Sequence, residues 1–95
     1  MGAAMRRAAK IDRNQTQIVA HLRKMGCSVL HLHTVGHGCP DLLVGYGGAN
    51  FLVEVKSATG KLTPDQEKFF NSWRGQVAIA RSIDEAMAIC TKSVL

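Results

Sequence analysis

The sequence predicts a single α/β domain in which helices flank a mixed β-sheet. Residues 14–25 carry apolar side chains at helical spacing. Residues 41–56 hold two apolar runs joined by a glycine-rich segment, which is typical of a β-hairpin. Helix-capping residues at Thr63 and Ser82 begin two later segments, and a short apolar run lies between them. With 95 residues, 46% of them apolar, the chain is long enough for one such domain.

The charge of the chain favours a polyanionic partner. Twelve Lys and Arg residues stand against seven Asp and Glu, which gives a net charge of +5. This excess does not separate DNA from RNA or from an acidic membrane. Residues 1–12 predict a flexible basic arm with Arg6, Arg7 and Lys10, either a contact arm or a solvated tail, ahead of a single domain over residues 13–95.

The first two elements are predicted over residues 14–25 and 28–35. The helix has one apolar stripe: Ile18, Leu22 and Met25. Gly26 then ends it. Strict alternation over residues 28–35 predicts a strand with Leu30 and Leu32 on one face and Val29, His31 and His33 on the other.

The next two runs predict a hairpin. Residues 41–46 form a short apolar run that suits a strand covered on both faces. The connecting turn contains Gly45, Gly47, Gly48 and Asn50. Residues 51–56 form the returning strand, with Phe51, Val53 and Val55 on one face and Leu52, Glu54 and Lys56 on the other.

The remaining chain predicts a helix, a strand and a helix. Thr63, Pro64 and Gln66 form a helix start, and Gly75 ends the helix. We expect its buried stripe to be Phe69, Phe70 and Trp73. Residues 76–80 return to the sheet through a crossover, which makes the sheet mixed. The last helix starts with a Ser82–Glu85 capping box, and its inward side chains are Ala86, Met87 and Cys90.

This layout brings three charged residues to one edge of the sheet. Asp41 opens the first hairpin strand, and Glu54 and Lys56 lie near the end of the second, antiparallel strand. Two neighbouring carboxylates favour a hard cation such as Mg²⁺, and a nearby lysine can stabilise charge on a phosphate. The alternative is an exposed Glu54–Lys56 pair with Asp41 as a turn residue.

The segment GCPDLLVGYGGANFLVEVK resembles the PD-(D/E)XK nuclease superfamily, and more narrowly its VRR-NUC group of small phage and bacterial domains. The similarity extends from DRNQTQIVAHLRKMGCSV to LTPDQEKFFNSWRGQVAIARS. It implies a restriction-endonuclease-like αβββαβ(α) core. It also implies a Mg²⁺-dependent DNA endonuclease in which Mn²⁺ can substitute.

The resemblance implies a role for each matching residue. Asp41 and Glu54 resemble the metal-binding carboxylates, and the Val55 carbonyl lies where the family often supplies a further ligand. Lys56 resembles the catalytic lysine. Gln66 resembles a glutamine that borders the site. Because Gln66 also suits the capping box of Thr63, we expect its side chain to divide its time between the two roles.

One position departs from the family pattern. Family members often carry a glutamate on the first helix, and the resemblance matches this position to Gln17. A neutral amide adds no negative charge, so the departure weakens the case for a second metal ion. Alternatively, Gln17 pairs with an Asn14 cap.

Several polar residues outside this core have competing interpretations. Those predicted to contact nucleic acid are Arg6, Arg7, Lys10, Arg13, His37 and Lys61. A zinc site would draw on Cys27, His31, His33, His37 and Cys39, but their spacing is not that of known zinc motifs. The three cysteines include no CxxC pair, so Cys27 and Cys90 are expected to act as small apolar residues.

The resemblance further implies a homodimer acting on branched DNA, such as a four-way Holliday junction. A symmetric dimer would place two active sites on paired strands. The alternatives are a non-catalytic DNA-binding module that keeps the fold and a nuclease directed to RNA. No apolar run is long enough for a membrane span, and the expected location is cytoplasmic.

Overall fold

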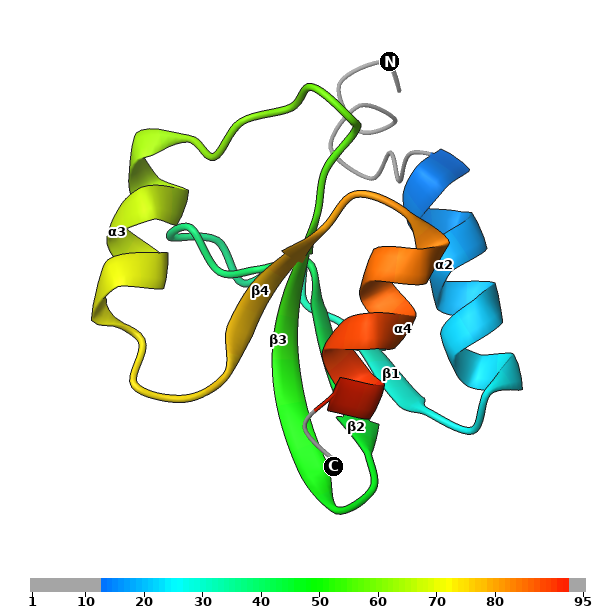
Figure 1. Ribbon diagram of the computed structural model, residues 1–95. Coiled ribbons are helices and arrows are strands. Elements are labelled where there is room, and N and C mark those ends of the chain that lie inside the picture. The colour runs from blue at the N-terminus through cyan, green and yellow to red at the C-terminus, as the bar shows by residue number, and fades with distance from the viewer. Residues whose placement is uncertain (1–12, 93–95) are drawn as a thin grey trace.

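The computed structural model describes residues 13–92, which fold into helices on both sides of one sheet (Figure 1). The elements are, in order, α2 (Arg13–Lys24), β1 (Ser28–His31), β2 (Leu42–Tyr46), β3 (Ala49–Val55), α3 (Pro64–Ser72), β4 (Val77–Ala80) and α4 (Ile83–Lys92). This order confirms the predicted α/β class. Within the described residues, each helix is too short or too polar to cross a lipid bilayer.

The four strands form one mixed sheet in the order β1-β2-β3-β4. The first three strands make an antiparallel meander, and β4 pairs with β3 in parallel after the crossover through α3. Gly47 and Gly48 make the β2–β3 turn with φ angles of 59° and 82°. Such positive values suit the two-residue turn of a twisted hairpin, which explains the glycines there.

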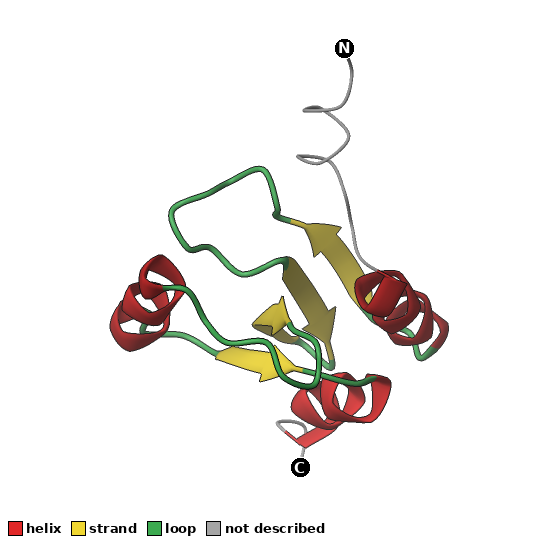
Figure 2. Cartoon of the chain, turned by 90° about the horizontal axis from the view of Figure 1, so that it is seen from above, coloured by secondary structure: helices red, strands yellow, loops and turns green. Residues whose placement is uncertain are grey.

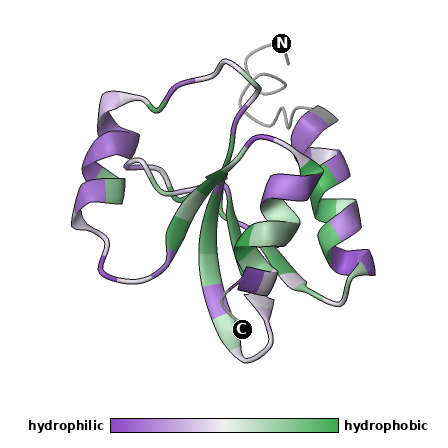
Figure 3. Cartoon of the chain, viewed as in Figure 1, coloured by the Kyte–Doolittle hydropathy of each residue, from purple (hydrophilic) through white to green (hydrophobic). Residues whose placement is uncertain are grey.

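Helices α2 and α4 cover one face of the sheet (Figure 2), and the apolar residues gather between them (Figure 3). The largest fully buried side chains on this side include Ile18, Leu22, Leu42, Val44 and Phe51. Cys27 and Cys90 are buried in the same core. Burial raises the pKa of both thiols, that of Cys90 to about 12. The two cysteines therefore behave as small apolar residues, as predicted.

The opposite face of the sheet is only partly covered. Leu43 is half-buried on this face, and its neighbour Leu30 on β1 is 61% exposed. The prediction that residues 41–46 are covered on both faces is therefore wrong for this side.

The buried stripe predicted for α3 is also wrong. None of its residues is buried: Phe69 and Phe70 are half-buried, and Trp73, which caps the helix, is 47% exposed. Helix α3 stands apart from the sheet (Figure 2), and the rings of Phe69 and Trp73 stack on each other at 5.1 Å between centroids. The amphipathic pattern correctly predicts a helix, but the sheet does not cover the apolar face of that helix.

Strand β1 is shorter than predicted, because its pairing partner begins at Leu42. The Leu32 N–H still donates to the Asp41 carbonyl at 2.7 Å, and the Val35 N–H then donates to the Leu32 carbonyl to form a turn. His33 consequently lies in this turn rather than on a strand.

Candidate active site

The hairpin brings Asp41 beside the end of β3. Leu42 pairs with Val53, so the residue before Leu42 lies next to the residues after Val53. The Val55 N–H donates to Asp41 Oδ2 at 2.9 Å. This bond orients the Asp41 carboxylate from the backbone of the strand that carries Glu54 and Lys56.

Glu54 is a buried carboxylate with one oxygen bonded and one left over. The residue is 3% exposed. Its Oε2 accepts from Gln66 Nε2 at 2.9 Å and lies 3.4 Å from Lys56 Nζ. Its Oε1 has no hydrogen-bond partner among the described residues. An unsatisfied buried carboxylate oxygen is costly, and a cation bound to it would remove that cost.

The pKa of Glu54 also shows that its negative charge is poorly stabilised by the surrounding protein. Burial, and after it the negative charge of Asp41, raise the pKa of Glu54 from its ordinary 4.5 to about 7. The Lys56 ammonium and the Asp41 backbone amide act in the opposite direction without cancelling the rise. The two carboxylates thus repel each other in a poorly solvated place, which a divalent cation would relieve.

Gln66 serves the helix cap and the site at the same time. Its Oε1 accepts from the Thr63 N–H at 2.9 Å, and its own N–H donates to Thr63 Oγ1 at 3.2 Å. Its Nε2 meanwhile donates to Glu54. The expectation that the side chain divides its time is wrong, because an amide has an acceptor and a donor group that can act together.

The loop between β1 and β2 closes over the first turn of α3. At Gly38, where φ is 80°, a Cβ would clash with the Asp65 carbonyl oxygen, so the two backbones are in close contact. The next residue, Cys39, is half-buried near the carboxylates. Burial, and then the charges of Glu54 and Asp41, raise the pKa of its thiol. Cys39 was not predicted near the site, although it lies two residues before Asp41.

The first helix contributes different residues from the one predicted. Gln17 is exposed, and its carbonyl lies 3.0 Å from His21 Nδ1. Asn14 lies inside α2 rather than at its cap, and its Nδ2 donates to the Lys56 carbonyl at 3.1 Å. Gln15 is 5% exposed, and its Nε2 lies 3.3 Å from His31 Nδ1. Gln15 extends the Ile18–Leu22 stripe toward the helix start, and a polar residue on that stripe was the available signal.

Of the residues predicted to contact nucleic acid, only His37 and Lys61 have side chains within the described structure. His37 and Lys61 are exposed. Arg6, Arg7 and Lys10 lie outside the described residues, as does the side chain of Arg13.

The zinc alternative receives no geometric support. Between residues 13 and 92, no three His, Cys, Asp or Glu side chains are arranged to hold a metal ion. Cys27 lies in the core, whereas His33 is exposed. Asp41 and Glu54 supply two neighbouring carboxylates.

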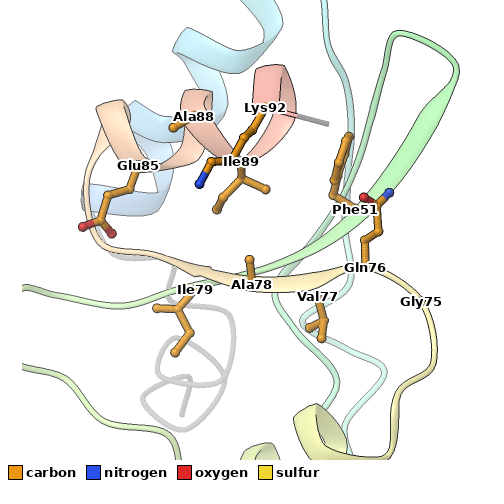
Figure 4. A pocket seen from close by; sticks show the side chains of 10 residues that line it. All are labelled: Phe51, Gly75, Gln76, Val77, Ala78, Ile79, Glu85, Ala88, Ile89 and Lys92. Carbon is orange, nitrogen blue, oxygen red and sulfur yellow. The ribbon is translucent and has the colours of Figure 1, made fainter. Parts of the chain in front are cut away.

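A pocket of about 540 Å³ lies elsewhere, between β4 and α4 (Figure 4). Apolar side chains such as Phe51, Ala78 and Ile89 line much of it. Its lining includes none of Asp41, Glu54 and Lys56.

Comparison with models of protein families shows which family the chain belongs to. Residues 5–86 match the model of the VRR-NUC domain. The chain belongs to the VRR-NUC family. A VRR-NUC domain is a nuclease-type domain, for which DNA is the implied substrate, and the matched range of this VRR-NUC chain includes Asp41, Glu54, Lys56 and Gln66. Searches of curated proteins and of solved structures found no match.

Proposed function

We propose that this protein is a magnesium-dependent DNA endonuclease whose active site is formed by Asp41, Glu54 and Lys56. The single observation that carries the proposal is the buried Glu54 carboxylate. Its Oε1 lacks a hydrogen-bond partner among the described residues, and Asp41 and Lys56 both influence its charge. A purely structural Glu54 would be expected to have both oxygens satisfied.

Mg²⁺ fits the donors that are present. Asp41 and Glu54 would hold it through carboxylate oxygens, and we propose the Val55 carbonyl as a further ligand. Mg²⁺ accepts such a partial protein shell because it keeps several of its waters, and Mn²⁺ can take the same ligands. When bound, the ion would lower the pKa of a water and help to hold the scissile phosphate.

The remaining side chains have roles that follow from their contacts. Lys56 Nζ lies 3.4 Å from Glu54 Oε2, so its positive charge is held where a phosphate near the carboxylates would meet it. Gln66 donates to the same oxygen, which leaves Oε1 of Glu54 for the metal. In this proposal, Lys56 stabilises charge on the phosphate, and Gln66 orients Glu54. Gln17, which is exposed, supplies no charge for a second metal ion.

We further propose that the protein acts on branched DNA as a homodimer. One small domain has little room for elements that read bases, so contacts to phosphates and recognition of shape are favoured. Exposed Leu30 and Trp73, at 61% and 47%, are apolar side chains that a second copy could cover. A symmetric dimer would then present two active sites to paired strands.

The test is a cleavage assay on linear, flap and four-way DNA with Mg²⁺, Mn²⁺ or EDTA. Faster cutting of branched substrates that EDTA abolishes supports the proposal, provided sedimentation shows a dimer at micromolar concentration. A monomer that cuts linear and four-way DNA equally would contradict the branched-DNA part. Tight DNA binding without metal-dependent cutting would favour a non-catalytic DNA-binding module.

A further inference from the structure

The backbone of Lys56 is held by two other elements of the fold. Its N–H donates to the Ala80 carbonyl at 3.1 Å. Its carbonyl accepts from Asn14 Nδ2 at 3.1 Å, and the same nitrogen lies 3.4 Å from the Arg81 carbonyl. The first turn of α2 is thus bonded to the ends of both β3 and β4, at the position where Lys56 leaves the sheet.

The loop that follows Lys56 is held by the side chain of Arg81. Arg81 Nη1 donates to the carbonyls of Ser57 and Gly60, each at 2.7 Å. The Gly60 N–H also donates to the Ser57 carbonyl at 3.3 Å, which closes residues 57–60 into a compact turn. A Cβ built at Gly60 would lie 3.5 Å from Lys56 Cδ, an ordinary contact distance, so the turn passes close to the Lys56 side chain.

We propose that Arg81 and Asn14 are positioning residues for the Lys56 ammonium, an inference that rests on the proposed nuclease function. A lysine side chain has considerable rotamer freedom, and fixing its backbone and one side of its stem restricts where Nζ can lie. Misplacement of a reacting group by 1 Å can cost about 100-fold in rate. Arg81 suits this role because its planar guanidinium directs two N–H bonds from one nitrogen.

A direct phosphate contact is the competing role for Arg81. Its Nη1 already donates to two carbonyls of the turn, at distances typical of strong charge-assisted bonds. Recruiting this nitrogen to DNA would open the turn next to Lys56. The contacts therefore favour positioning over DNA binding.

The kinetic test compares Arg81→Lys with Arg23→Lys in single-turnover cleavage. Both changes keep the positive charge. Arg23 is a matched control because its Nη2 donates to a backbone carbonyl, that of Val29, at 3.1 Å. We expect Arg81→Lys to lower the cleavage rate about 10- to 100-fold, with DNA affinity within about twofold of wild type, and Arg23→Lys to change neither. An unchanged rate, or a loss confined to DNA affinity, would overturn the proposal.

A second measurement needs no activity. NMR relaxation of the Lys56 side chain should show an ordered stem in the wild type and in Arg23→Lys, and a mobile one in Arg81→Lys. Asn14→Ala, which removes the other donor, should also loosen Lys56. An equally ordered Lys56 in folded Arg81→Lys and Asn14→Ala would overturn the positioning role. If the wild type cuts no DNA, the nuclease proposal fails, and the relaxation data still decide this inference.

Discussion

At the scale of single residues, Glu54 is the one described residue whose buried side chain has an oxygen without a hydrogen-bond partner. It is 3% exposed, close to a second carboxylate, and bonded through only one of its oxygens. Such an arrangement is unfavourable without a bound cation, and it suits the metal-binding role proposed for Glu54.

The first prediction concerns the metal-free protein. The pKa of Glu54 is raised to about 7 from 4.5, so folding favours the protonated form. The contribution of Glu54 to stability is therefore present below pH 4.5 and lost as the pH rises through 7. Glu54→Gln cannot ionise. In urea titrations with EDTA, the free energy of unfolding of the variant should rise by about 3 kcal/mol relative to that of the wild type as the pH goes from 4 to 8. A difference that does not change with pH would contradict the raised pKa.

The second prediction separates the two roles of Gln66. Gln66→Glu keeps an acceptor for the Thr63 N–H but replaces the donor to Glu54 with a negative charge, so the pKa of Glu54 should rise further. Gln66→Leu loses both bonds. In Gln66→Glu, the pH–rate profile should shift to higher pH, while α3 stays capped. In unfolding titrations at pH 4, where Glu54 is protonated, Gln66→Leu should lose about 1 kcal/mol of the free energy of unfolding through the missing cap bond, and Gln66→Glu should not. An unshifted profile in Gln66→Glu would show that Gln66 does not tune Glu54.

At the scale of elements, α3 is positioned by its first turn. Gln66 bonds it to Glu54, and Gly38 lets the β1–β2 loop approach the Asp65 carbonyl. The far end of α3 carries the exposed Trp73 stacked on Phe69. The placement of α3 is therefore coupled to the candidate active site more than to the core.

The third prediction uses two glycines of the same loop. Gly36 and Gly38 have φ angles of 79° and 80°, so alanine is strained at both positions. Only at Gly38 would the new Cβ also clash with α3, since nothing lies within 4 Å of it at Gly36. We expect Gly36→Ala to cost about 1 kcal/mol and Gly38→Ala about 3 kcal/mol. Unfolding followed by the fluorescence of Trp73, the single tryptophan, measures both. Equal costs would contradict the close approach.

Local signals made most of the elements predictable. The Gly47–Gly48 turn and the capping residues Thr63 and Gln66 act within a few residues, so the sequence alone indicates them. The end of β1 was not predictable, because it depends on where the partner strand begins. The exposure of Trp73 was missed for a similar reason: periodicity marks an apolar face without saying what covers it.

The candidate site was predictable where strand pairing alone determines proximity. Antiparallel pairing suffices to bring Asp41 to the end of β3. The bonds around Lys56 were not predictable, because Asn14 is 42 residues away and Arg81 is 24 residues from Ser57. No local rule links such positions. The contact of Asn14 with Lys56 was not predicted for the same reason, whereas Gln15 could have been found as a polar residue on the apolar stripe of the helix.

At the scale of the whole molecule, the two faces of the sheet differ in what covers them. One face is closed by α2 and α4 and holds the core (Figure 2). The other carries Glu54 and is only partly covered, with Leu30 of β1 61% exposed. The net charge of +5 favours a polyanionic partner.

The fourth prediction concerns the basic residues of the N-terminal arm. If Arg6, Arg7 and Lys10 contact phosphates, removing residues 1–10 should weaken DNA binding and make it less dependent on salt. The slope of log affinity against log salt should fall in magnitude by about 2 to 3. Fluorescence anisotropy at several salt concentrations measures it. An unchanged slope would identify the arm as a solvated tail.

The decisive measurement is single-turnover DNA cleavage with Mg²⁺ by wild type, Asp41→Asn and Lys56→Met. Lys92→Met is the matched control, because Lys92 lies at the end of α4 and lines the separate apolar pocket. We expect Asp41→Asn and Lys56→Met each to lose at least about 100-fold in rate, while Lys92→Met and the wild type cut equally and only with a divalent cation. Cleavage that persists in Asp41→Asn or Lys56→Met, or in EDTA, would contradict the proposed active site.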